Sequence, residues 1–158
     1  MRLGHLRLDV QDLDGQIAFY TAALGLTVRE RVDTDGTRYA FLTDGAAVPG
    51  HPDGMHHRLV LRASDKALGD TTRLDHVAWE VDDERALWDA VERLRALGAP
   101  TDLQDARIAW QCYSEDPEGV RLEVYCDRRD RPDGAPLWEG RQSSLNEARL
   151  REAAGVTS

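Results

Sequence analysis

Two histidines and one glutamate stand at positions from which they could hold one divalent metal ion. His5 begins a segment in which polar and apolar side chains alternate, and His76 occupies the same place in a second such segment. Glu123 lies in a third alternating segment. Two imidazoles and one carboxylate on one side of an ion suit non-haem Fe(II) or Mn(II), because they leave neighbouring positions open for substrate and oxygen. We therefore predict a metal site at His5, His76 and Glu123 that holds Fe(II) or Mn(II).

The two histidines belong to an internal repeat whose copies begin about 72 residues apart. The first copy opens with Leu-Gly-His-Leu-Arg-Leu at residues 3–8, and the second opens with Leu-Asp-His-Val-Ala-Trp at residues 74–79. Their period-two alternation predicts half-buried strands. An acidic turn and a helical stretch follow in both copies, and each stretch ends near a glycine, Gly25 or Gly98, which can adopt the left-handed conformation of a helix C-terminus.

Apolar spacing predicts which side of these elements faces the core. In the first helical stretch the predicted apolar stripe consists of Leu13, Ile17, Tyr20 and Leu24. In the second copy, alternation places Trp79 on the helix-facing side of its strand, opposite His76. Metal ligands on the other side of the strands would be left available for chemistry.

Strand-like segments follow each helix and complete the predicted fold. They cover residues 28–32, 38–42 and 57–61 in the first copy and 108–113 and 120–125 in the second, where a third strand is poorly marked. Each copy therefore predicts a βαβββ module. The expected fold class is α+β, with two tandem modules forming a curved mixed sheet as a cup around the metal and the helices outside.

The expected boundaries place module one at residues 1–64 and module two at 72–127, in a single domain of residues 1–127. A tail of residues 128–158 contains Ser144 and Glu147 at the spacing of a capping box, which predicts a short last helix. Turns are predicted at residues 33–36 and 116–119, a linker at 65–72, and a long loop at 43–54 that carries His51.

Composition limits the partners. The chain has 158 residues, enough for one domain, and a net charge of -9, which disfavours binding to nucleic acid. No run of about 18 apolar residues predicts a membrane span, and the N-terminus has no basic stretch before an apolar one. We expect a cytoplasmic protein without nucleic-acid or membrane partners, in which Cys112 and Cys126 are reduced thiols.

These motifs together resemble the vicinal oxygen chelate superfamily, which includes glyoxalase, bleomycin-resistance proteins and extradiol ring-cleaving dioxygenases. The resemblance runs from about residue 2 to residue 127. It rests on Gly-His-Leu at residues 4–6, Leu-Gly-Leu at 24–26, Leu-Asp-His-Val-Ala at 74–78, and Asp-Pro-Glu-Gly at 116–119 before Leu122 and Glu123. It implies the two-module fold and supports the three metal ligands, but the family uses this fold for several reactions.

Within the family, the chain is most similar to the small single-domain extradiol dioxygenases. The paired histidines before Arg58 resemble a strand of those enzymes in which the second histidine, here His57, stands beside the metal as an acid/base group. Tyr113 precedes Glu123 by ten residues, as does a tyrosine that hydrogen-bonds the substrate oxygens there. The resemblance thus implies an Fe(II)-dependent extradiol dioxygenase that cleaves a catecholic or related aromatic substrate with O2, and it implies a homodimer.

Other interpretations remain open. A glyoxalase- or epimerase-type lyase or isomerase would use a fourth ligand, usually a glutamate on the last strand of module one, where this sequence has His56, His57 and Arg58. A metal-free protein that binds a drug or metabolite would not need the three ligands. The histidine pair could also be structural, and Tyr113 could be an aromatic residue of the core.

Overall fold

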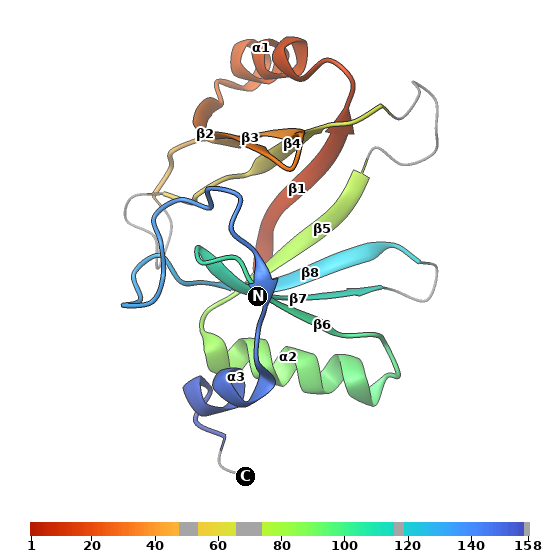
Figure 1. The fold of residues 1–158 in the computed structure, drawn as a ribbon, viewed down its shortest axis with the longest axis vertical. Coiled ribbons are helices and arrows are strands. Elements are labelled where there is room, and N and C mark those ends of the chain that lie inside the picture. Colours follow the sequence, from red (N-terminus) through yellow and green to blue (C-terminus); the bar gives the residue numbers. More distant parts are fainter. Residues whose placement is uncertain (48–53, 66–73, 116–118, 157–158) are drawn as a thin grey trace. The chain divides into compact units, whose positions relative to one another are not determined.

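Both halves of the chain contain the βαβββ order of elements that the repeat predicts (Figure 1). The computed structural model describes residues 1–47, 54–65, 74–115 and 119–156. The chain divides into a first unit, Gly4–Val77, and a second unit, Ala78–Ser158 together with Met1–Leu3. The fold class is therefore confirmed as α+β, with two such modules and a short C-terminal helix.

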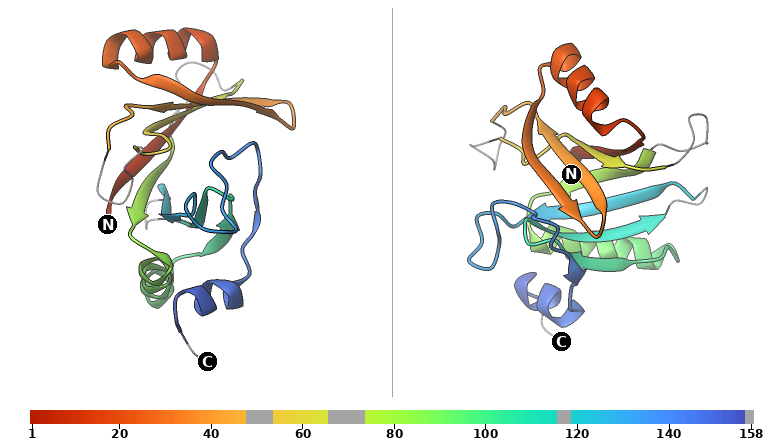
Figure 2. Two further views of the ribbon diagram at one scale, coloured as in Figure 1. Left: turned by 90° about the vertical axis from the view of Figure 1, so that its left-hand side faces the viewer. Right: turned by 45° about the horizontal axis from the view of Figure 1, so that its top comes forward.

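The first unit is built on strands and one helix in chain order: β1 (Arg2–Val10), α1 (Leu13–Leu24), β2 (Thr27–Thr34), β3 (Thr37–Thr43) and β4 (Leu59–Ala63). Its strands lie in the order β2-β3-β4-β1, antiparallel except for the parallel pair of β4 and β1. Helix α1 lies along one face of β2, β3 and β4 (Figure 2). The buried core of this face consists of Val10, Leu13, Ile17, Leu26, Ala40, Leu42, Leu59 and Leu61.

Local sequence explains where α1 begins and ends. Asp12 caps its N-terminus by accepting a hydrogen bond from the Gly15 amide at 2.9 Å. Gly25 ends it with a φ of 68°, as predicted, and its amide donates to the Thr21 carbonyl oxygen.

The second unit continues with β5 (Leu74–Val81), α2 (Glu84–Ala96), β6 (Asp102–Asp105), β7 (Ala109–Glu115), β8 (Arg121–Asp127), β9 (Ser143–Ser144) and α3 (Glu147–Ala153). Its strands lie in the order β5-β8-β7-β6-β9, and β5 begins in the first unit. Helix α2 packs on β7 and β8, and α3 packs against α2. The side chains of Leu87, Val91 and Leu150 are fully buried between these elements.

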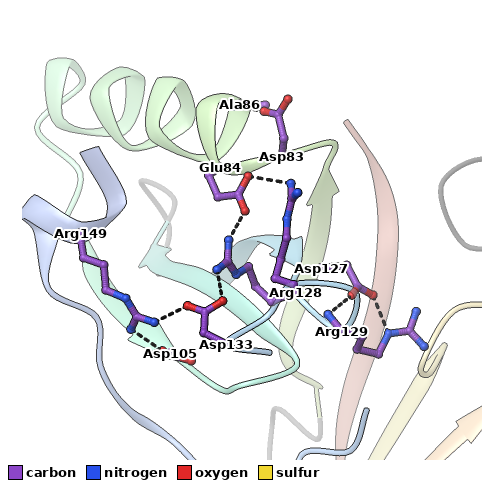
Figure 3. A network of polar contacts seen from close by, with 10 residues as sticks. Asp83, Glu84, Ala86, Asp105, Asp127, Arg128, Arg129, Asp133 and Arg149 are labelled. Atoms are coloured by element: carbon purple, nitrogen blue, oxygen red, sulfur yellow. Dashed lines mark hydrogen bonds and ion pairs between the residues drawn. The ribbon is translucent and has the colours of Figure 1, made fainter. Parts of the chain in front are cut away.

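The C-terminal tail is fixed to the second unit by a network of ion pairs (Figure 3). Arg128 is buried, donates to Glu84 at the start of α2 and to Asp133, and lies 3.9 Å from the centre of the Trp110 ring. Arg149 of α3 donates to Asp133 and, at 2.9 Å, to Asp105 of β6. Residues of the tail therefore form part of the packed structure of this unit.

Two predicted details of the elements are wrong, and one weakly marked element is confirmed. The cap of α3 is Asn146, whose side chain accepts from the Ala148 amide at 2.8 Å, whereas Ser144 lies in β9. Strand β4 begins at Leu59, so His57 precedes it. The weakly marked third strand of module two is β6, a strand of four residues.

Two apolar side chains that were expected in the core are exposed. Leu24, the last residue of α1, is 65% exposed. Trp79 is 39% exposed on β5, whereas Trp110 of β7 is buried. The period-two pattern placed Trp79 opposite His76, but a local pattern does not contain the tertiary contacts that decide how far a side chain is buried.

Several predicted segments lie outside the described residues: His51 with half of its loop, most of the linker at 65–72, and all but Gly119 of the turn at 116–119. Among the described helices none combines the length and the apolar character that a membrane crossing requires.

Candidate metal centre

His5 of β1 and His76 of β5 bring their ring nitrogens together in the first unit. Both side chains are buried, and their Nε2 atoms lie 3.2 Å apart. An ion pair between Arg7 and Asp75, at 2.8 Å, joins the same two strands one step further along. The equivalent positions of the repeat are therefore neighbours in space, as the two-module fold requires.

Asp75 determines which nitrogen of His76 faces His5. Oδ1 of Asp75 lies 2.8 Å from Nδ1 of His76, and Oδ2 of Asp75 accepts from Arg7. Because an ionised carboxylate can only accept, Nδ1 of His76 carries the hydrogen, and in the neutral ring that a metal ligand requires Nε2 carries the lone pair. A carboxylate behind a metal-binding imidazole commonly fixes the ligand in this way.

The geometry of the two histidines fits a shared divalent ion. Metal–imidazole bonds are about 2.1 Å long, so nitrogens 3.2 Å apart would subtend an angle of about 100° at a common ion. That angle lies between the octahedral and tetrahedral values. A lone pair directed at a second ring nitrogen at this distance is stabilised by a cation or a shared hydrogen between them.

His57 lies beside this pair and belongs to a chain of buried polar groups. Its ring centre is 4.2 Å from that of His5, and its Nδ1 is 2.9 Å from Nδ1 of His56. Nε2 of His56 lies 3.2 Å from a carboxylate oxygen of Glu30. Phe41 packs edge-on against the rings of His57 and His56, whose centres lie 5.1 Å and 5.7 Å from its own.

Glu123 and Tyr113 are cross-strand neighbours in the second unit. They lie directly opposite each other on the antiparallel pair β8 and β7, and both are buried. Facing residues of antiparallel strands share one side of the sheet. The Tyr113 hydroxyl accepts a hydrogen bond from Gln111 at 3.0 Å, and a phenol that accepts in this way can also donate its own hydrogen.

Tyr125 of β8 is a second buried phenol, and it stays neutral at physiological pH. Burial raises the pKa of Tyr125 well above its usual value, and the negative charges of Glu80 and Glu123 add to this effect. Glu80 is itself buried and pairs with Arg2 at 2.7 Å. This side of the second unit's sheet therefore combines carboxylates with hydrogen-bond donors.

The structure brings the predicted site residues together in two groups, one in each unit. His5, His76 and His57 lie together in the first, and Glu123 and Tyr113 in the second; the three predicted ligands are all buried. Sequence reasoning missed Glu30, Gln111 and the role of Asp75. Only Asp75 had a signal, since a carboxylate next to a predicted histidine ligand is a candidate partner for its second nitrogen.

A model of the glyoxalase/bleomycin resistance protein/dioxygenase superfamily matches residues 2–124. The catechol-2,3-dioxygenase of Bacillus subtilis (strain 168) is 28% identical over 130 residues, which make up 80% of this chain and 41% of that protein. The chain thus spans less than half the length of this curated relative.

Solved structures share the fold at lower identity. The 2,3-dioxygenase LapB from Pseudomonas sp. KL28 is similar with a TM-score of 0.64 and 22% identity, over 96% of this chain and 48% of that chain. Methylmalonyl-CoA epimerase from Streptomyces coelicolor is similar with a TM-score of 0.58 and 21% identity, over 80% of this chain and 97% of that chain. From the match to the family model over most of its length, together with the two βαβββ modules, the chain belongs to the glyoxalase/bleomycin resistance protein/dioxygenase superfamily.

Proposed function

We propose that the protein is an Fe(II)-dependent dioxygenase of the extradiol type, which cleaves the ring of a catecholic or related aromatic substrate with O2. The observation that carries this proposal is the buried pair of His5 and His76, whose Nε2 atoms lie 3.2 Å apart with Asp75 behind His76. Glu123 is proposed as the third ligand. Mn(II) is the alternative ion.

A redox-active divalent ion held by these ligands would supply chelation of the two substrate oxygens and activation of dioxygen. The protein residues have separate tasks. His57, beside His5, accepts a proton from a substrate hydroxyl, because an imidazole titrates near neutral pH. Tyr113 donates a hydrogen bond to a substrate oxygen, where negative charge grows during the reaction. Both side chains are buried, so water competes little for these contacts.

The ligand set supports dioxygenase chemistry over four-ligand isomerase chemistry. In β4 the residues on the same side as Arg7 and Asp9 of β1 are Val60 and Arg62, as the strand register shows. Neither offers the carboxylate that a glyoxalase-type site would use. Three protein ligands leave more positions for substrate and oxygen.

A second candidate function is a metal-dependent lyase or isomerase of the glyoxalase or epimerase type. One observation favours it: the chain shares its fold with methylmalonyl-CoA epimerase from Streptomyces coelicolor, with a TM-score of 0.58. We also propose a homodimer, which the family resemblance implies and which light scattering after size-exclusion chromatography would test.

Oxygen consumption separates these functions. The protein is reconstituted with Fe(II) without air, then mixed with a panel of catechols and with oxygen, while oxygen uptake and the yellow absorbance of ring-opened product are recorded. We expect uptake and colour with wild type, and both should vanish in Glu123→Ala. His57→Phe should keep the metal and lose most turnover. Metal binding without oxygen uptake would support the isomerase instead, and the absence of metal binding would support a metal-free binding protein.

A further inference from the structure

Glu30 is the one buried residue of strand β2. The other seven residues of the strand are exposed or half-buried, and Glu30 is 8% exposed. A buried carboxylate on an otherwise exposed strand is costly unless it has partners, so its place needs an explanation.

An irregularity in the strand directs Glu30 inward. Val28 pairs with Leu42 of β3, but Glu30 pairs with Phe41, so Arg29 is an extra residue in the register. Such a β-bulge moves the following side chains to the opposite face of the sheet. Glu30 consequently shares a face with Phe41, whose ring packs on His56 and His57.

Three buried groups then follow one another from β2 toward the candidate metal centre. Oε2 of Glu30 lies 3.2 Å from Nε2 of His56, at the distance of an ion pair, although the direction is not that of a well-aligned hydrogen bond. Nδ1 of His56 lies 2.9 Å from Nδ1 of His57, and the His57 ring lies against His5.

The positions of the hydrogens follow from these distances. Two Nδ1 atoms at 2.9 Å share one hydrogen, so one ring donates and the other accepts. A carboxylate beside Nε2 of His56 favours a hydrogen on that nitrogen, since a lone pair there would face negative charge. In the neutral pair, Nδ1 of His56 is then the acceptor, and His57 must donate from Nδ1.

We propose that Glu30 and His56 are positioning residues that hold His57 in the tautomer with its hydrogen on Nδ1 and its lone pair on Nε2. This inference rests on the proposed function, in which His57 accepts a proton from the substrate. A neutral imidazole can accept at only one nitrogen, so the tautomer decides whether the accepting nitrogen points away from His56. Phe41 restricts the tilt of both rings.

The tautomer can be measured without turnover. Zn(II) is diamagnetic, so the Zn(II)-loaded protein with 15N-labelled histidine gives ring nitrogen chemical shifts that distinguish protonated from unprotonated nitrogens. In wild type we expect His57 to be protonated on Nδ1 only. In Glu30→Gln the amide can present either its oxygen or its NH2 group to His56, so we expect His57 to become a mixture of tautomers.

Matched variants separate positioning from packing. Asp33→Asn removes a carboxylate from an exposed site on the same strand and should leave the His57 spectrum unchanged. His56→Leu removes the acceptor and should also give mixed tautomers.

Kinetics give the second readout. With a catechol that wild type turns over, Glu30→Gln should lower kcat about 10- to 100-fold with little change in KM, the usual effect of removing an orienting partner. A His57 spectrum in Glu30→Gln that matches Asp33→Asn would overturn the inference. If wild type turns over no catechol but shows the expected tautomer pattern, the proposed reaction fails while the positioning role stands.

Discussion

Asp75 and His76 are consecutive in the sequence, and Oδ1 of the one lies 2.8 Å from Nδ1 of the other. Arg7 holds the second oxygen of the same carboxylate at 2.8 Å. The lone pair of His76 is thereby fixed on Nε2, which faces His5. The proposed metal centre thus depends on a residue that does not itself bind the metal.

Replacement of this carboxylate should weaken metal binding without removing a ligand. In Asp75→Asn the amide can donate to Nδ1 of His76 and move the hydrogen to Nε2. We expect the dissociation constant for Fe(II) to rise about 10- to 100-fold, as is common when the partner of a histidine ligand is lost. Competition with a chromophoric chelator without air measures this constant. Asp33→Asn is the control, and equal affinities in the two variants would contradict the role of Asp75.

Loss of the Tyr113 hydroxyl should slow catalysis and leave the metal bound. Tyr113→Phe removes the proposed donor to the substrate oxygen, and a donor of this kind contributes about 100- to 1000-fold to kcat. Steady-state kinetics with the best substrate of the catechol panel test this, with Tyr39→Phe as the control. Since Gln111 also loses an acceptor, thermal unfolding of the variant is measured alongside. An unchanged kcat would show that the Tyr113 side chain contributes to packing and that its hydroxyl does not contribute to catalysis.

The buried thiols should make the protein sensitive to alkali. Burial raises the pKa of Cys112 to about 11 and that of Cys126 to about 12, from an ordinary value of 9.0. The unfolded thiols ionise first, so their contribution to stability is complete below pH 9 and is lost as the pH rises toward these values. Between pH 8 and pH 10.5, Cys126→Ala should lose about 2 kcal/mol less stability than wild type.

Urea unfolding at the two pH values measures this difference. Val91→Ala is the control, since it also opens space in the same core but keeps both thiols. It should retain the wild-type dependence on pH. The same dependence in Cys126→Ala and wild type would show that the Cys126 thiol ionises equally readily in the folded and unfolded chain.

Removal of the Arg128 guanidinium should destabilise the second unit. Arg128→Met leaves the buried Glu84 paired with Arg131 at 3.1 Å and removes the contact with the Trp110 ring. We expect a loss of about 3 kcal/mol in the free energy of unfolding. Arg141→Met, at an exposed position, should lose little. In a double-mutant cycle, adding Glu84→Gln to Arg128→Met should cost less than Glu84→Gln costs alone, and strict additivity would contradict the proposed coupling.

The features that were predicted correctly from the sequence are those contained in the internal repeat. Alternation and equivalent spacing gave β1 and β5, and they placed His5 and His76 at matching positions, which the structure shows to be neighbours. The roles of Gly25 and Gly98 after the helices were also predicted correctly, because the backbone there needs a positive φ. These features are encoded within a few residues of each other.

The remaining features depend on contacts distant in sequence. Glu30 stands between two arginines and looks like a surface residue, and only the bulge in its pairing with β3 turns it inward. Strand β6 has little apolar alternation and gains its place by pairing with β7 and β9. Asn146 rather than Ser144 caps the N-terminus of α3, because Ser144 pairs with Gln104 in the sheet. No local pattern contains this information.

Metal stoichiometry tests the central claim most directly. Equilibrium dialysis against Fe(II) without air, followed by metal analysis, is carried out on wild type, His76→Ala, Glu123→Ala and Asp127→Asn, the last removing a carboxylate from the end of the same strand as Glu123. We expect one tightly bound ion per chain in wild type and Asp127→Asn, and loss of that ion in His76→Ala and Glu123→Ala. Tight binding of one ion by Glu123→Ala would contradict the assignment of His5, His76 and Glu123 as the metal ligands.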